Sequence, residues 1–344
     1  MSYTNGLDKP SDYFNTKLYT GNGSTQSITG VGFQPDWVWI KRRNNAADHK
    51  LYDVVRGATK VLESSGTSAE GTDANGLTAF NSDGFSLGSS ASHNGLNDTF
   101  ASWNWLAGGT ASSNTDGSIT SSVSANTTAG FSVVTYTGNS SGSNSDTVGH
   151  GLASAPSVII VKSRSASDTW AMYHQSNGTG KHQVLNLSNA VSTDANIYPT
   201  APTSTVFYPG SQPTTNSLSR TYVAYCFAEK KGFSKFGSYT GNGSTDGTFV
   251  YTGFKPAMII FKNTTAEFWN IFDNKRDPFN EADAKLYPNG SNAEASTSQL
   301  DFVSNGFKLR SSEPEFNQSG TEIIYMAFAE NPFVTSTGIP TTAR

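Results

Sequence analysis

The feature that most constrains the fold is a cassette that the chain repeats three times. The string YTGNGST stands at 19–25 and again, letter for letter, at 239–245, and a looser copy, YTGNSSG, stands at 136–142. A proline, an apolar run ending in lysine and an aromatic-rich run follow each copy. The proline-to-lysine spacing is the same in all three: Pro35 to Lys41, Pro156 to Lys162 and Pro256 to Lys262. A period of about one hundred residues is too long for a solenoid or propeller blade, so it predicts tandem whole domains.

The apolar runs inside each cassette have strand character. A proline just before such a run fits a strand start, because its missing N–H breaks no ladder hydrogen bond there. The run VIIV (158–161) is uninterrupted and TYVAYCFA (221–228) is apolar on both alternating sides, so both predict strands covered on two faces. Many short apolar runs separated by Gly, Asn, Ser and Pro predict an all-β fold of three related β-sandwich repeats of jelly-roll type.

The repeat also predicts equivalent strands and the chain's organisation. Residues 37–41, 158–162 and 258–262 become matching interior strands, with buried side chains at Val158, Ile160, Ile259 and Phe261. Gly and Asn tolerate positive φ, so the YTGNG turn is predicted to form the first hairpin of each sandwich. The predicted segments are an N-terminal docking arm (1–13), repeat 1 (14–109), a Ser/Thr-rich linker (110–130), repeat 2 (131–231), repeat 3 (232–334) and a polar tail (335–344).

Composition excludes several function classes. Charged residues make up 15% of the chain against roughly 25% in an ordinary soluble protein, and no basic cluster is denser than 41–43, so no nucleic-acid partner is expected. The one cysteine, Cys226, excludes an intrachain disulfide framework and is expected to be a buried small hydrophobe. The chain has no signal-peptide start and no apolar run near the ~20 residues that span a bilayer, so we expect a soluble protein made in a cytoplasm.

The sequence offers one apparent nucleophile motif. GNSSG at 138–142 matches the G-x-S-x-G pattern, which requires a strand-to-helix turn in an α/β sheet. The sister copies read GNGST and have no serine at the matching position. We therefore predict that Ser140 is a turn residue with no histidine within hydrogen-bonding reach, and that the chain is not an enzyme and binds no cofactor.

Metal-ligand patterns are also weak. The histidines show neither H-x-H nor H-E-x-x-H spacing; they are His49, His93, His150, His174 and His182. Asp73, Asp83 and Asp98 lie among Gly and Asn, a composition that suits calcium, yet no EF-hand series is present. We predict no metal site and leave calcium in the loops as an alternative.

Two features bear on glycans. Glycosidases need two carboxylates flanking a cleft, and Glu229 and Glu330 occupy matching cassette positions, which predicts that they lie a domain apart. The tryptophan pairs 37/39 and 103/105 each share a sheet face and could stack on sugars. Core packing is favoured for them, because the matching positions in other cassettes are Ile, Tyr or Phe.

The strings GLDKPSDYF, GVGFQPDWVWIKRR, DGSITSSVSAN, GFSVVTYTGN, VGHGLASAPSVIIVKSRS and YVAYCFAE resemble a repeat domain of virion proteins of tailed bacteriophages, especially marine ones. That family includes proteins labelled tail fibre or virion structural protein, with concanavalin A-like sandwiches. The resemblance spans Gly6 to about Phe333. It implies a component of the viral particle surface and transfers no catalytic residue.

These observations favour a non-enzymatic virion protein, such as a tail fibre or receptor-binding component that contacts a host surface glycan or receptor. The alternatives are a capsid decoration or head-fibre protein, and a lectin-like module or glycan-active enzyme. Expected partners are other virion proteins and further copies of this chain, with a trimer favoured. Tyr3, Tyr13 and Phe14 are predicted to be the apolar anchors by which the N-terminal arm binds a partner.

Overall fold

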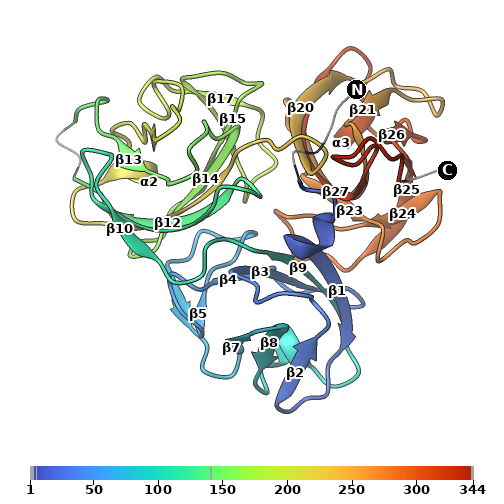
Figure 1. The fold of residues 1–344 in the computed structure, drawn as a ribbon, viewed down its shortest axis with the longest axis horizontal. Coiled ribbons are helices and arrows are strands. Elements are labelled where there is room, and N and C mark those ends of the chain that lie inside the picture. The colour runs from blue at the N-terminus through green and yellow to red at the C-terminus, as the bar shows by residue number, and fades with distance from the viewer. Residues whose placement is uncertain (1–3, 5, 140–141, 342–344) are drawn as a thin grey trace.

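The computed structural model describes residues 4, 6–139 and 142–341 and has three β lobes arranged in a triangle (Figure 1). We name them lobe 1 (14–105), lobe 2 (112–227) and lobe 3 (234–332). Within the described residues, helix is confined to the short elements η1 (Pro10–Asp12), α1 (Ala91–Asn94), α2 (Pro213–Asn216) and α3 (Pro314–Asn317). The all-β prediction is confirmed. None of the described helices has the length and apolar character of a membrane-spanning helix.

Lobe 1 packs a four-stranded sheet, ordered β1-β9-β3-β4, on a three-stranded sheet, ordered β2-β8-β7. A further pair, β5-β6, lies beside them. Its strands are β1 (Phe14–Thr20), β2 (Gln26–Thr29), β3 (Trp37–Arg42), β4 (Lys50–Asp53), β5 (Lys60–Val61), β6 (Gly71–Thr72), β7 (Leu77–Asn81), β8 (Gly84–Leu87) and β9 (Thr99–Trp105).

Lobe 2 contains an eight-stranded sheet, ordered β10-β11-β12-β19-β14-β15-β16-β17, and a two-stranded sheet, β13-β18. Its strands are β10 (Ser112–Asn114), β11 (Ser121–Asn126), β12 (Phe131–Thr137), β13 (Val148–Gly149), β14 (Val158–Ser163), β15 (Trp170–His174), β16 (Lys181–Val184), β17 (Ser192–Thr193), β18 (Val206–Phe207) and β19 (Thr221–Phe227).

Lobe 3 packs two four-stranded sheets, ordered β20-β27-β22-β23 and β21-β26-β25-β24. Its strands are β20 (Ser234–Thr240), β21 (Phe249–Tyr251), β22 (Phe254–Asn263), β23 (Asn270–Asp273), β24 (Ala282–Lys285), β25 (Ala295–Val303), β26 (Gly306–Leu309) and β27 (Glu322–Pro332). One strand order therefore recurs in the three lobes, as β1-β9-β3-β4, β12-β19-β14-β15 and β20-β27-β22-β23.

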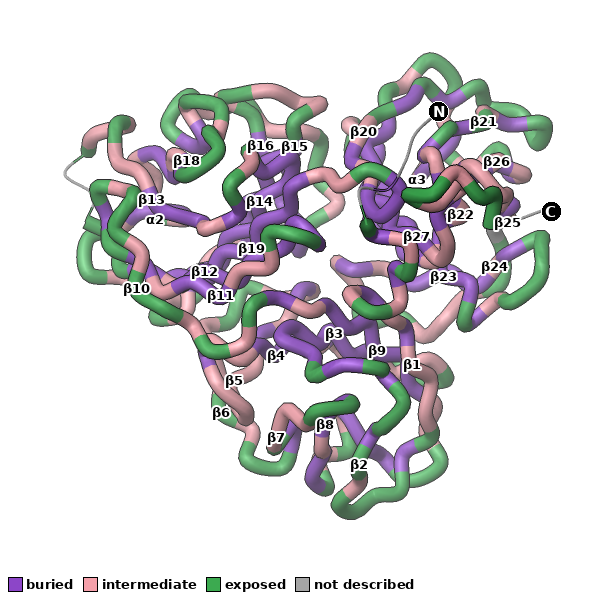
Figure 2. Tube along the Cα trace, in the orientation of Figure 1, coloured by how far each residue is buried: buried purple, intermediate pink, exposed green. Residues whose placement is uncertain are grey.

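Alternate residues of the inner strands face two different cores. On β14, Val158 and Ile160 belong to a central core, whereas Ile159 and Val161 belong to the core of lobe 2. On β22, Met258 and Ile260 face the central core, and Ile259 and Phe261 face the core of lobe 3. The predicted burial of Val158, Ile160, Ile259 and Phe261 is confirmed, and Figure 2 shows buried chain where the inner strands of the lobes meet.

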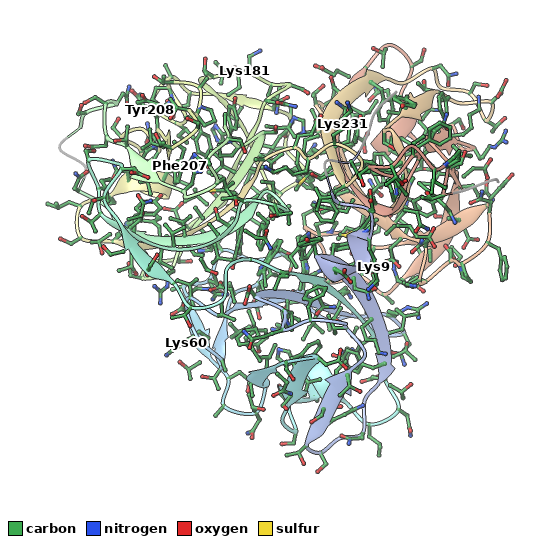
Figure 3. All side chains as sticks on the ribbon, in the orientation of Figure 1. Lys9, Lys60, Lys181, Phe207, Tyr208 and Lys231 are labelled. Atoms are coloured by element: carbon green, nitrogen blue, oxygen red, sulfur yellow. The ribbon has the colours of Figure 1, made fainter. Side chains whose placement is uncertain are left out.

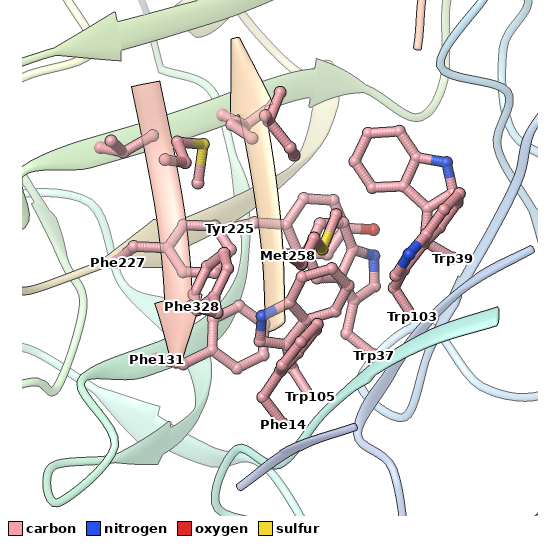
Figure 4. Packing of buried hydrophobic residues seen from close by; sticks show 14 of the residues in the cluster. Phe14, Trp37, Trp39, Trp103, Trp105, Phe131, Tyr225, Phe227, Met258 and Phe328 are labelled. Atoms are coloured by element: carbon pink, nitrogen blue, oxygen red, sulfur yellow. The ribbon is translucent and has the colours of Figure 1, made fainter. Parts of the chain in front are cut away.

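The central core is shared by all three lobes (Figure 4). The ring centroids of Trp37 and Tyr225 lie 4.3 Å apart and join lobes 1 and 2. Phe328 of lobe 3 packs against Phe14 of lobe 1 at 5.1 Å and against Phe227 of lobe 2 at 5.8 Å. Because every pair of lobes is joined by aromatic contacts, the lobes form one body rather than domains that meet only through linkers.

Two local predictions are wrong. The segment 110–130 is not a linker, since β10 and β11 lie within it and β11 pairs with β12 along its whole length. The YTGNG turn does not close a hairpin, because β1 pairs with β9 whereas β2 pairs with β8. The turn carries the chain from one sheet to the other.

The short helices explain why YTGN recurs. Each YTGN tyrosine donates its hydroxyl to a carbonyl oxygen just before the helix's last asparagine, from Tyr19 to His93 at 2.8 Å, Tyr136 to Thr215 at 2.6 Å and Tyr239 to Phe316 at 2.5 Å. That asparagine in turn accepts the backbone N–H of the YTGN asparagine. The bonds run from Asn22 to Asn94, Asn139 to Asn216 and Asn242 to Asn317, at 3.0, 3.1 and 3.0 Å.

Candidate functional site

Ionisable side chains gather where the lobes meet. Asp53, the last residue of β4, accepts a 2.9 Å hydrogen bond from the Tyr225 hydroxyl of lobe 2 and pairs with Arg56 at 2.5 Å. Asp273, the last residue of β23, accepts a 3.0 Å hydrogen bond from the Trp103 indole of lobe 1 and pairs with Arg276 at 2.5 Å. Both aspartates and both arginines are buried. A buried charge pair of this kind depends on full hydrogen bonding, which the neighbouring lobe completes.

We call these contacts between lobes, Asp53 with Tyr225 and Asp273 with Trp103, joints. The third joint, between lobes 2 and 3, has a neutral residue at the strand end where the other two have an aspartate. His174 is the last residue of β15, and its Nε2 donates to the Tyr325 carbonyl oxygen of lobe 3 at 3.2 Å. Its Nδ1 accepts the Ser176 backbone N–H at 3.2 Å, so the two partners define one neutral tautomer. Burial lowers the pKa of His174 to about 4, although the bond to Tyr325 opposes the shift.

Three lysines make matching contacts between lobes. Lys41, Lys162 and Lys262 are fully buried, and each donates to the carbonyl oxygen of the next residue in its own strand. Each Nζ also donates to a carbonyl oxygen of another lobe: Lys41 to Ser291 at 3.3 Å, Lys162 to Thr67 at 3.2 Å and Lys262 to Ser188 at 3.5 Å. Burial lowers the pKa of each lysine to about 8. Lobe 1 thus contacts lobe 3, lobe 3 contacts lobe 2, and lobe 2 contacts lobe 1.

Two glutamates connect arginines of different lobes. Glu70 of lobe 1 pairs with Arg56 at 3.3 Å and with Arg164 of lobe 2 at 2.9 Å. Glu294 of lobe 3 pairs with Arg276 at 3.0 Å and with Arg43 of lobe 1 at 2.7 Å. Burial would raise the pKa of both carboxyls, but the guanidinium groups outweigh it and lower them. The charges of both glutamates are therefore paired in contacts that connect the lobes.

One buried cluster resembles a catalytic triad in composition. The Tyr52 hydroxyl lies 2.6 Å from Nε2 of His93, and Nδ1 of His93 lies 3.6 Å from a carboxylate oxygen of Asp73. Tyr52 and His93 are shut off from solvent. Burial raises the pKa of the Tyr52 hydroxyl and lowers that of His93 to about 4, so neither the nucleophile nor the base is activated. The cluster is a core hydrogen-bond network.

The other sequence candidates are not brought together. Ser140 lies outside the described residues, so its predicted environment stays a prediction. Among the residues that the structure describes, no three His, Cys, Asp or Glu side chains could jointly hold a metal ion. The calcium candidates are engaged separately: Asp73 accepts the Ser90 hydroxyl, Asp83 accepts two backbone N–H groups, and Asp98 pairs with Arg42. Cys226 is buried, as predicted.

The glycan-related candidates have structural roles. Glu229 pairs with Lys235 at 2.8 Å, and Glu330 pairs with Lys255 at 2.7 Å, so the two glutamates are in separate ion pairs. The tryptophans at 37, 39, 103 and 105 are all buried in the central core, which confirms core packing. The lysines labelled in Figure 3 lie on different parts of the molecule and form no single basic patch.

Two of the three predicted N-terminal anchors, Tyr13 and Phe14, contact the chain itself. Tyr3 lies outside the described residues. Tyr13 packs edge-on against Phe233 at 5.9 Å, and Phe14 is 2% exposed in the central core. The prediction that Phe14 binds a partner is wrong, because its strand β1 pairs with β9 and places the ring among Trp105 and Phe328.

Sequence reasoning missed the residues that join the lobes. Asp53 and Tyr225 are 172 positions apart, so no local pattern connects them. One feature of the sequence could have indicated these contacts. The lysine that ends each apolar run is a charged residue at an inner strand position. Such a residue requires a dedicated set of acceptors when it is buried.

Comparisons with known proteins identify one family. No curated protein and no solved structure matches the chain. One family, described as "Domain of unknown function (DUF7483)", matches residues 9–332, which includes all three lobes and the η1 turn. The chain therefore belongs to the DUF7483 family.

Proposed function

We propose that this chain is a non-enzymatic structural protein exposed on a bacteriophage particle, as a tail fibre or receptor-binding component. The observation that carries the proposal is the use of the buried ionisable groups. Asp53, Asp273 and the three inner lysines each make a hydrogen bond to another lobe. A body fixed in this way suits a rigid exposed scaffold, and the resemblance of the cassette strings to phage virion repeats supplies the biological setting.

The distribution of carboxylates disfavours the glycan-active enzyme. A glycosidase needs two carboxyl groups facing each other across one cleft. The cavities that contain Asp277, Glu229 or Glu330 each have that one carboxylate in their walls. We therefore keep the enzyme only as an alternative, together with the capsid decoration or head-fibre protein.

Assembly with other virion proteins, and with two further copies of this chain in a trimer, is part of the proposal. Trimerisation would multiply weak contacts with a host surface through avidity. Light scattering of the purified chain measures the number of copies, and a trimer is the expected result.

Location on the particle tests the function. Mass spectrometry of density-purified phage particles from the source of this sequence should detect the chain in several copies per particle. Immunogold electron microscopy with antibodies against the purified chain should then label the tail. Gold on the capsid would favour the decoration protein, and absence of the chain from purified particles would contradict both particle roles.

A further inference from the structure

We infer that lobe 3 binds a neutral sugar ring in the cavity beside Phe279. The cavity has a volume of about 300 Å³, at the lower end of the roughly 300–1,000 Å³ of small-molecule sites. Its wall includes Lys255, Asn274, Asp277, Phe279, Phe302 and Ser304.

The cavity is formed by a loop that departs from the pattern of lobe 1. In both lobes an aspartate ends a strand and pairs with an arginine three residues later, as Asp53 with Arg56 and Asp273 with Arg276. The chain then returns to bridge the same strand through Leu62 in lobe 1 and Leu286 in lobe 3. Leu62 follows Arg56 by six positions, whereas Leu286 follows Arg276 by ten. The extra residues carry Phe279, and a loop extension on a framework that two lobes share is a usual place for a binding function.

Phe279 presents its ring to solvent at the edge of this cavity. It is 77% exposed, more than any other large apolar side chain among the described residues. The loop that carries it is nevertheless fixed. The Asn280 side-chain amide donates to the Phe302 carbonyl oxygen and accepts the Phe302 N–H, both at 3.0 Å. An exposed aromatic ring on a fixed loop loses little entropy on binding, so it suits a stacking contact.

The charged side chains of the wall already have partners within the chain. Lys255 pairs with Glu330 at 2.7 Å, and the Asp277 carboxylate accepts the Asp283 backbone N–H at 2.8 Å and that of Ala284. The charge of Lys255 is thus balanced by Glu330, and the Asp277 carboxylate, which keeps its negative charge, disfavours an anionic ligand. An uncharged ligand with several hydrogen-bonding groups is the better match.

Asn274, in the wall of the cavity, has a buried acceptor without a partner in the described part of the chain. This residue is 8% exposed, and its Oδ1 has no hydrogen-bond partner among the described residues. A buried carbonyl oxygen without a partner is unfavourable, so a hydroxyl group that donates to it would be bound favourably. A pyranose combines such hydroxyls on its rim with apolar C–H faces that can lie on the Phe279 ring. Neutral pyranoses are therefore the class of ligand that the cavity fits.

The biological meaning, recognition of sugars on a host surface, rests on the proposed function. Saturation-transfer NMR and calorimetric titration test the binding itself, with methyl glucoside, methyl galactoside and N-acetylglucosamine as probes. At least one probe should bind the full-length chain at millimolar concentration. Phe279→Ala should raise the Kd for that probe about tenfold, as expected for an anchoring aromatic side chain, and Phe279→Trp should restore binding.

The matched control is Phe249→Ala on β21. Phe249 is also an exposed aromatic side chain of lobe 3, at 47%, but it does not line the cavity. Its variant should bind as the unaltered chain does. If none of the three probes binds, or if Phe279→Ala binds as tightly as Phe249→Ala, the site is refuted. Neither result bears on whether the chain is found in particles, so the two proposals fail separately.

Discussion

Glycine at the third place of YTGN is required by close packing rather than by backbone conformation. A Cβ atom added to Gly21 would lie 2.1 Å from the Gly95 carbonyl oxygen, and one added to Gly138 or Gly241 would lie 2.3 Å from the matching carbonyl oxygen. The sheet-crossing turn touches the end of the short helix at this point. Any side chain would push the turn away from the helix asparagine that holds it.

Gly21→Ala should therefore destabilise the protein by about 1–3 kcal/mol, because overpacking would displace the turn. The control is Gly66→Ala, since the nearest atom to a Cβ there is a flexible Glu63 oxygen at 3.5 Å. The control should change the free energy of unfolding by less than ~0.5 kcal/mol. Urea denaturation measures both, and equal effects would contradict the packing account.

His174 should make stability depend on acid pH. The unfolded histidine takes up a proton near pH 6.5, whereas burial holds the pKa of the folded residue at about 4. The free energy of unfolding should thus fall as the pH drops from about 6.5 to 4, by at most ~1.4 kcal/mol per pH unit from this one proton.

His174→Gln removes that proton while keeping a donor for Tyr325 and an acceptor for Ser176. Its free energy of unfolding should decline less steeply than that of the unaltered chain over the same pH range. Denaturant titrations at several pH values measure how steeply the free energy of unfolding changes with pH in each protein. The values are referenced to pH 8, where the histidine and the glutamine at position 174 are both neutral. Parallel slopes would show that His174 is not the group that titrates.

At the scale of strands, the inner strands could be predicted from the sequence but their two faces could not. The runs at 158–161 and 258–261 are apolar throughout, which indicates a strand covered on both sides. Nothing in such a run tells which alternate residues face the lobe's own core and which face the other lobes. That assignment needs the pairing of β14 with β19 and of β22 with β27, and each partner strand lies about sixty residues downstream.

The contacts between lobes and the cavity beside Phe279 could not be predicted from the sequence for a different reason. Tyr225 and Asp53 have ordinary local contexts, and only the triangular packing of the lobes brings them within 2.9 Å. Phe279 lies in a polar loop where a single aromatic residue carries no pattern. The linker prediction failed because Ser- and Thr-rich composition also suits a strand at the exposed edge of a sheet, as β10 is.

Breaking a joint should be far more damaging than breaking a surface pair. Asp53→Ala would leave Arg56 buried beside Tyr225 with Glu70 as its remaining carboxylate, so we expect a loss of about 3–5 kcal/mol. The control is Asp12→Ala, which removes an exposed pair with Lys9 and should lower stability by at most ~1 kcal/mol. Chemical denaturation compares them, and a mild effect of Asp53→Ala would contradict the role of the joint.

At the scale of the whole molecule, the three lobes form one body. Their inner sheets share the central core, and a closed ring of contacts runs from lobe 1 to lobe 3 to lobe 2 and back. The DUF7483 match across residues 9–332 has the same extent as this body.

Native-state hydrogen exchange tests this central claim most directly. Ile160 faces the shared core and Ile159 faces the core of lobe 2, so the matched variants are Ile160→Ala and Ile159→Ala. Each should cost about 2–5 kcal/mol by leaving a cavity. If the molecule unfolds as one unit, each variant will lower the protection of the slowest amides in all three strands β3, β14 and β22, and by the same free energy in each strand. Loss of protection confined to β14 would show instead that the lobes are independently folded domains.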